Sequence, residues 1–213
     1  MDDVIKNAVD YVKKVFKDDF SGHDYFHTLR VYKTATMLAK REGADLYVVQ
    51  LGALLHDVDD FKLSPQTYHN KDNARAFLVE NGVSEKDVER IVTIIDQVSF
   101  KGTDSIKPTS IEGECVQDAD RLDALGAIGI ARAFAYGGNH NRVMYNPEEA
   151  PKLNLSGEEY RTHVSTTINH FYEKLFTLKE LLNTTSAKEI ATHRENYMRS
   201  FINEFMDEWE GIK

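Results

Sequence analysis

The sequence contains few of the residues that cross-link a chain or break its helices. It has one cysteine, Cys115, so no intrachain disulfide forms. Only four prolines and 12 glycines occur among 213 residues, which favours helices over a turn-rich β fold. The longest strongly apolar stretch, 46–55, is too short to span a bilayer. The first residues, Met1-Asp2-Asp3, lack the features of a signal peptide, so we expect a cytoplasmic protein without a membrane partner.

Positive charge is also scarce. The formal net charge is -9 at pH 7, whereas a dedicated duplex-DNA binder normally carries a basic stripe, so we expect no nucleic-acid partner. Hydrophobic residues make up 41% and charged residues 29% of the chain, which excludes wholesale disorder. No internal repeat or linker-like stretch divides the sequence. We therefore predict one domain over residues 1–213.

Apolar residues recur with the 3.6-residue period of an α-helix in nearly every segment, which predicts an all-α fold. The segment 46–56 is apolar on all sides apart from Gln50 and His56, which is typical of a central core helix. Gly43 and Asp45 are the expected end of one helix and N-cap of the next. Two long loops are expected at 100–114 and 137–155, the second as a lid or binding loop. The expected helices cover 2–18, 24–41, 46–56, 71–81, 84–98, 118–136, 157–182 and 185–211.

Side chains that bind metals occur on three of these helices. His56 and Asp57 end the apolar core helix, and a buried Asp is rare unless it is paired or bound to a metal. His27 shares an inward-facing stripe with Val31, and Asp118 is expected at the start of a helix. Each residue alone has an ordinary structural explanation. Together, two His and two Asp form a mixed nitrogen and oxygen donor set that suits Mn, Fe, Co, Ni or Zn.

The order of His27, His56-Asp57 and Asp118 resembles the H…HD…D pattern of the HD superfamily of metal-dependent phosphohydrolases. Two longer runs resemble the bacterial YpgQ/YedJ-type branch more specifically: Asp-Ala-Asp-Arg-Leu-Asp-Ala from residue 118 and His-Phe-Tyr-Glu-Lys-Leu from residue 170. The resemblance covers about residues 20–210, almost the whole chain.

This resemblance implies a single HD-type helical bundle, with a metal-binding core at about 20–136 and C-terminal helices at about 157–211 packing on it. It implies one divalent metal ion held by His27, His56, Asp57 and Asp118. Manganese is the first choice, with Co, Ni, Fe, Zn and Mg as alternatives. HD enzymes with two metal ions have further histidines between the His-Asp pair and the final Asp. His69 is the only histidine between Asp57 and Asp118, so a second metal ion is not expected. For this branch the implied reaction converts (deoxy)nucleoside triphosphates into a monophosphate and pyrophosphate.

Three polar residues near the expected ligands have two interpretations each. Asp60, one helical turn beyond His56, is the candidate general base or water positioner, and otherwise a solvated helix-end carboxylate. Lys62 is either a phosphate contact or a surface lysine. Arg121 either clamps a phosphate or forms a structural ion pair with a neighbouring aspartate.

The C-terminal half supplies further candidates for binding the substrate. One helix stripe with polar residues borders an apolar stripe, so its cations either meet an anion in a pocket or extend to solvent. On the long loop, a cation and an aromatic ring are expected to meet the outer phosphates and to stack on the base or sugar. The candidates are His163, His170 and Lys174 on the stripe, Arg142 and Tyr145 on the second loop, and Lys101 on the first.

Other functions stay open at this stage. The enzymatic alternatives are a nucleotide phosphomonoesterase and an alarmone hydrolase, and the non-enzymatic one is a sensor module that binds metal or nucleotide without turnover. A homodimer also stays open, because one stripe of the last helix fits either an intrachain core or a dimer seam. That stripe consists of Tyr197, Phe201, Phe205 and Trp209.

Overall fold

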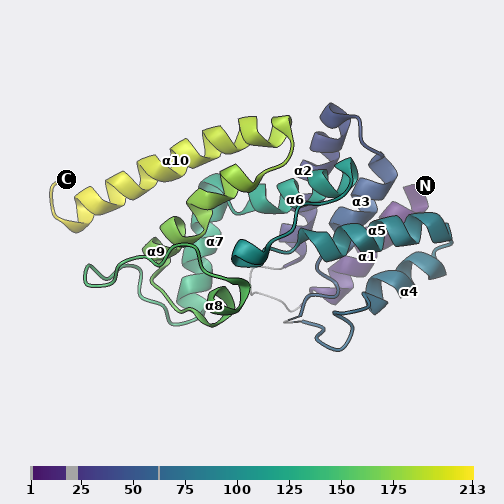
Figure 1. The fold of residues 1–213 in the computed structure, drawn as a ribbon, viewed down its shortest axis with the longest axis horizontal. Helices are drawn as coiled ribbons and strands as arrows, with labels where there is room; N and C mark the ends of the chain where they lie inside the picture. Colours follow the sequence, from purple (N-terminus) through teal and green to yellow (C-terminus); the bar gives the residue numbers. More distant parts are fainter. Residues whose placement is uncertain (1, 18–23, 62) are drawn as a thin grey trace. The chain divides into compact units, whose positions relative to one another are not determined.

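The computed structural model describes residues 2–17, 24–61 and 63–213, and this part of the chain is all-α, as predicted (Figure 1). The described residues form ten α-helices and two short 3-10 segments, with no strand among them. Within these ranges no helix combines the length and the apolar character needed to cross a membrane. The elements are α1 (Asp2–Val15), α2 (Tyr25–Glu42), α3 (Leu46–Leu55), α4 (Asp72–Glu80), α5 (Glu85–Val98), η1 (Gly102–Asp104), α6 (Ile111–Asp123), α7 (Gly126–Asn139), α8 (Gly157–Thr162), α9 (Thr167–Glu173), η2 (Leu175–Leu181) and α10 (Thr185–Trp209).

These elements belong to two compact units, which are described separately. The first unit runs to Ser99 and includes Ile106–Asp120, and the second comprises Phe100–Ser105 and Arg121–Lys213. The second unit thus includes α7, which the sequence analysis assigns to the metal-binding core.

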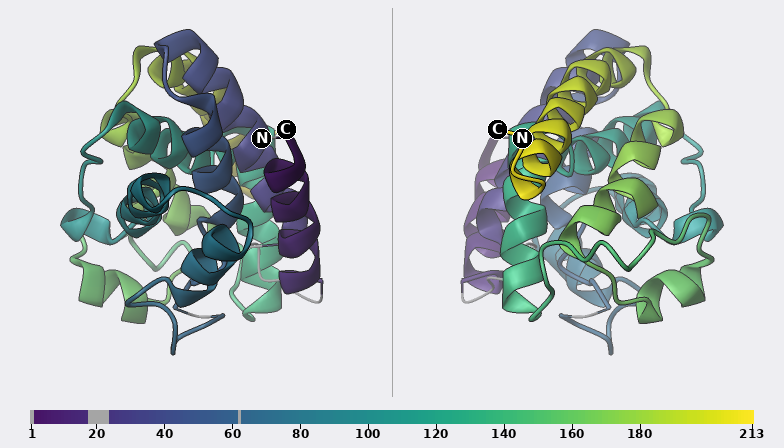
Figure 2. Two further views of the ribbon diagram at one scale, coloured as in Figure 1. Left: turned by 90° about the vertical axis from the view of Figure 1, so that its right-hand side faces the viewer. Right: turned by 90° about the vertical axis from the view of Figure 1, so that its left-hand side faces the viewer.

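The first unit is built around α3, the expected central helix. It packs against α1, α2 and α5, and α2 and α3 lie side by side in Figure 2. Local capping sets the turn between α2 and α3. Gly43 ends α2 in the left-handed conformation, with φ at 72°, and the Asp45 carboxylate accepts hydrogen bonds from Tyr47 N and Val48 N. The predicted roles of Gly43 and Asp45 are confirmed.

The second unit has an aromatic core formed by α7, α9 and α10. The Phe134 ring centroid lies 5.8 Å from that of Phe201 and 6.3 Å from that of Phe171, which is fully buried. α10 packs along α7, as the right-hand view of Figure 2 shows. Phe201 and Phe205 therefore pack within the chain, while Trp209 stacks on Phe205 and stays 44% exposed.

Two long helices expected from the sequence are divided. The segment 118–136 belongs to α6, which begins at Ile111, and to α7, because Gly126 adopts φ of 75° and interrupts the helix. The segment 157–182 is divided into α8, α9 and η2. The hydroxyl of Thr166 accepts a hydrogen bond from Asn169 N and starts a new helix there. The loop expected at 137–155 begins only after Asn139.

Candidate metal centre

Three of the four expected metal ligands meet in the first unit. His27 lies in the first turn of α2, where the Asp24 carboxylate caps the helix by accepting a hydrogen bond from His27 N at 2.7 Å. His56 is the C-cap of α3, and Asp57 follows it. All three residues are buried, and one potential ligand atom from each lies within 4.8 Å of the other two. The apolar helices thus bring two imidazoles and a carboxylate to one buried point.

The orientation of the His56 ring is fixed by the backbone. Its Nδ1 atom lies 2.8 Å from the Ala53 carbonyl oxygen, which can only accept a hydrogen bond, so Nδ1 carries the proton in the neutral ring. The lone pair is then on Nε2, which lies 3.1 Å from Asp57 Oδ2. The Nε2 atom of His56 is buried and has no hydrogen-bond partner of suitable geometry. A histidine held through one nitrogen with the other directed at a carboxylate is the arrangement of a metal ligand.

A second carboxylate, that of Asp120 on α6, also approaches the two imidazoles. Its Oδ1 atom lies 3.4 Å from His27 Nε2 and 4.0 Å from His56 Nε2. Burial alone lowers the pKa of His56, but the negative charges of Asp57 and Asp120 outweigh it and raise that pKa. Burial likewise raises the pKa of Asp120, while its hydrogen bond to His27 and the nearby positive charge lower it overall. The site therefore attracts positive charge, and its donor set fits a divalent transition metal.

Asp118, the fourth expected ligand, is not in the group that converges. It is fully buried on α6, two positions before Asp120. Residues two positions apart on an α-helix point about 200° apart around the axis, so these two carboxylates face different surroundings. The sequence analysis places a helix start at Asp118, whereas α6 begins at Ile111. The H…HD…D pattern leaves open which aspartate of the run from residue 118 approaches the histidines, and the structure places Asp120 there.

Asp59 and Asp60, which follow the ligand pair, differ in their burial and in their contacts. Asp60 is half-buried in a turn in which its backbone N donates to the Asp57 carbonyl at 3.0 Å. Asp59 is 2% exposed, and both of its carboxylate oxygens accept backbone hydrogen bonds from the start of α4. Asp59 is therefore engaged in structure, while Asp60 stays a candidate. Lys62 lies outside the described residues.

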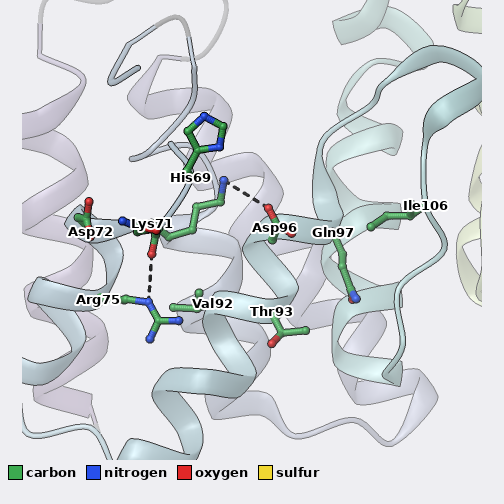
Figure 3. Close-up of a pocket in the computed structure, with 10 residues that line it drawn as sticks. His69, Lys71, Asp72, Arg75, Val92, Thr93, Asp96, Gln97 and Ile106 are labelled. Carbon is green, nitrogen blue, oxygen red and sulfur yellow. Dashed lines mark hydrogen bonds and ion pairs between the residues drawn. The ribbon is translucent and has the colours of Figure 1, made fainter. Parts of the chain in front are cut away.

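A separate cavity of about 480 Å³ lies in the same unit, around the start of α4 and one face of α5 (Figure 3). The Lys71 and Arg75 side chains that line the cavity each form an ion pair with a carboxylate. Lys71 Nζ lies 3.5 Å from Asp96 Oδ1, and Arg75 contacts Glu89 through both terminal nitrogens. None of the three converging residues lines this cavity, so we do not assign it to the metal centre.

The second unit gathers four of the proposed substrate-binding residues. Burial lowers the pKa of His170 most, and together with the positive charges of Lys174, Arg142 and His163 it brings that pKa to about 3. His163, His170 and Lys174 do not share one helix stripe as predicted, because α8 ends before His163 and α9 ends before Lys174. The fold nevertheless brings their charges together around a neutral ring.

Two of these residues are held in place by specific contacts. His163 Nε2 lies 3.0 Å from Glu173 Oε1, which also accepts hydrogen bonds from Ser165 Oγ and Lys152 N. Lys174 Nζ lies 4.6 Å from the centre of the Phe100 ring. Glu173 is a site residue that the sequence analysis missed, since nothing in the local pattern distinguishes it from a surface carboxylate.

Three other candidates have positions with structural explanations. The Arg121 guanidinium is buried and donates to the Leu181 carbonyl, so at least one of its nitrogens is engaged in a structural contact. The half-buried Tyr145 ring packs edge-on against Trp209, with the ring centroids 5.1 Å apart. Lys101 is half-buried and precedes η1.

Comparison with known proteins agrees with these features. Residues 24–125 match the HD domain family. A structure from Lactobacillus plantarum is 40% identical, with 97% of each chain covered and a TM-score of 0.86. An HD-superfamily hydrolase from Bacillus thuringiensis is 42% identical, covering 97% of this chain and 96% of that one, with a TM-score of 0.77. Bacillus subtilis YpgQ in complex with ADP is 33% identical, covering 96% of this chain and 100% of that one, with a TM-score of 0.76. The chain therefore belongs to the HD domain family, in the branch that includes YpgQ.

Proposed function

We propose that the protein is a metal-dependent phosphohydrolase that cleaves nucleoside triphosphates into a monophosphate and pyrophosphate. The observation that carries the proposal is the buried meeting of His27, His56 and Asp57, with Asp120 beside the two imidazoles. The similarity to an HD-superfamily hydrolase supports the reaction class, and the ADP complex of YpgQ supports a nucleotide as ligand.

The proposed ligands are His27, His56, Asp57 and Asp120, so Asp120 replaces Asp118 in the expected set. Two imidazole nitrogens with two carboxylates suit manganese, our first choice, as well as Co, Ni, Fe or Zn. When bound, such an ion neutralises phosphate charge and lowers the pKa of a water molecule at the site. The Ala53 carbonyl holds the His56 ring in the tautomer that this role requires.

Asp60 is the proposed acceptor of the water proton. It lies three residues beyond Asp57, and its side chain is half-buried. Asp59 is unsuitable because Asn73 N and Ala74 N already donate to its two oxygens. A general base must lie within hydrogen-bond reach of the water, and the position of Asp60 just after the ligand pair favours it between the two.

Arg142, His163 and Lys174 are the proposed phosphate-binding residues of the second unit. Their positive charges help lower the pKa of His170, which stays neutral at physiological pH and can donate one hydrogen bond and accept another. The fixed positive charges of Arg142 and Lys174 suit a polyanion, and an arginine can bind phosphate through two parallel hydrogen bonds.

The test is a turnover screen with metal-stripped protein reloaded with Mn, Co, Ni, Zn or Mg. Nucleoside mono- and triphosphates are offered, and phosphate is detected with and without added pyrophosphatase. We expect signal from triphosphates only when pyrophosphatase is present, loss of it in His56→Ala, and wild-type turnover in His193→Ala, which removes an exposed histidine of α10.

Other outcomes of the screen contradict the proposal. Phosphate released from monophosphates alone identifies a phosphomonoesterase. Tight nucleotide binding without turnover in any metal identifies a sensor module.

A further inference from the structure

The backbone that follows the ligand pair is tied to a helix distant in the sequence. Asp59, two residues after Asp57, accepts hydrogen bonds from Asn73 N at 3.1 Å and from Ala74 N at 3.0 Å, one on each carboxylate oxygen. Asp59 is 2% exposed, so these bonds are shielded from water. The first turn of α4 is thereby fixed to the segment that carries the metal ligands.

This link takes the place of a local helix cap. The N-cap position of α4 is Lys71, whose side chain makes no capping hydrogen bond. Helices require partners for their first backbone N–H groups, and a carboxylate at that end is also favoured by the helix dipole. Asp59 supplies both the hydrogen-bond acceptors and the negative charge, although it lies 14 residues before Asn73 and 15 before Ala74. The same two bonds therefore cap α4 and join segments that are distant in the sequence.

The side chain of Asn73 adds a second connection. Its Nδ2 atom donates to the Val58 carbonyl at 3.1 Å and to Thr67 Oγ1 at 3.1 Å. Asn73 therefore holds the residue directly after Asp57 and also the middle of the loop that leads to α4. Through its backbone and side chain together it contacts Val58, Asp59 and Thr67.

The contacts of the Lys71 side chain stabilise the backbone turn that leads into α4. The Lys71 φ of 55° lies in the left-handed region, which is costly for a residue with a side chain and persists only where neighbouring contacts enforce it. The Lys71 ammonium donates to the Tyr68 carbonyl at 2.5 Å and lies 3.5 Å from Asp96, as Figure 3 shows for the second contact. The buried Lys71 side chain thus helps to enforce the turn into α4 through its polar contacts.

We propose that Asp59 and Asn73 are positioning residues that form a clamp on the backbone after His56-Asp57 and hold the two ligands in place before a metal ion binds. This inference rests on the metal centre of the proposed function. A site that is already ordered loses less conformational freedom on binding, so its affinity is higher. The clamp residues contact neither substrate nor metal.

Three variants test the clamp. Asp59→Asn keeps the size of the side chain but replaces one acceptor oxygen with an N–H group that opposes a backbone N–H. Asn73→Ala removes both side-chain bonds and keeps the backbone bond to Asp59. Ser84→Ala is the matched control, because it removes the N-cap bond of α5, from Asp87 N to Ser84 Oγ, in the same unit. Mn²⁺ is titrated into each metal-stripped protein by calorimetry, and thermal unfolding is measured without metal.

We expect Asp59→Asn and Asn73→Ala to bind Mn²⁺ about 10- to 100-fold more weakly than wild type, and Ser84→Ala to stay within about twofold. All three lower the unfolding temperature of the metal-free protein. Wild-type affinity in both clamp variants overturns the inference, as does an equal loss in Ser84→Ala, which would show that affinity merely follows stability. If the wild-type protein binds no Mn²⁺, the proposed metal centre itself is wrong and the clamp falls with it.

Discussion

Replacing Asp120 with asparagine should weaken metal binding far more than the same change at Asp118. Asp120 Oδ1 lies 3.4 Å from His27 Nε2 and 4.0 Å from His56 Nε2, while Asp118 points about 200° away from Asp120 around α6. Two unit charges 4 Å apart interact by about 4 kcal/mol at an effective dielectric constant of about 20. The Asp120 side chain is 26% exposed, so we reduce this to about 2–4 kcal/mol, or roughly 30- to 1,000-fold in affinity.

Asp118→Asn provides the matched comparison. This residue is fully buried, so its substitution should lower the free energy of unfolding by about 1–3 kcal/mol while Mn²⁺ affinity stays within about threefold. The assay is calorimetric titration of Mn²⁺ into metal-stripped protein, together with urea unfolding of the same samples. Loss of Mn²⁺ binding in Asp118→Asn with wild-type affinity in Asp120→Asn would refute the assignment of Asp120.

Three further predictions concern the second unit. The pKa of His170 is lowered from 6.5 to about 3 in the folded protein, so unfolding takes up a proton between these two pH values. The free energy of unfolding of the wild type should therefore fall by about 1.4 kcal/mol per pH unit from this residue as the pH falls from 6.5 to 3. Urea unfolding of His170→Asn should show a shallower decline, and an unchanged slope would contradict a neutral His170 ring. Gly137→Ala places a Cβ 2.3 Å from Thr167 Oγ1 and should cost about 1–3 kcal/mol in urea unfolding, whereas Gly138→Ala meets nothing within 4 Å, so equal losses would disprove the close approach. Arg142→Ala should raise KM for a nucleoside triphosphate about tenfold with little change in kcat, and an unchanged KM would remove Arg142 from phosphate binding.

The sequence predicts the first unit better than the second because its helices carry local start and stop signals. Gly43 and Asp45 mark one turn by their own chemistry, and the apolar run of α3 is buried as expected. The interruptions in the second half have subtler causes. Gly126 breaks a helix only because it adopts positive φ, and Thr166 starts α9 only because its hydroxyl turns back onto Asn169 N. Neither conformation can be read from the residue type alone.

In the candidate site too, local sequence signals predict some features, while others depend on tertiary contacts. The periodic pattern predicts an inward-facing His27, and its side chain is buried beside His56. Choosing between Asp118 and Asp120 requires knowing which face of α6 meets the two histidines, and tertiary packing decides this. The link between Asp59 and α4 is a tertiary contact over 14 residues, which no local pattern indicates.

The most direct test of the metal centre is a crystal of the wild-type protein grown with Mn²⁺ and measured for anomalous scattering at the manganese edge. We predict one strong peak per chain, coordinated by His27, His56, Asp57 and Asp120, and its absence from crystals of His56→Ala. A peak coordinated elsewhere, or no peak in the wild-type protein at saturating Mn²⁺, would contradict the account.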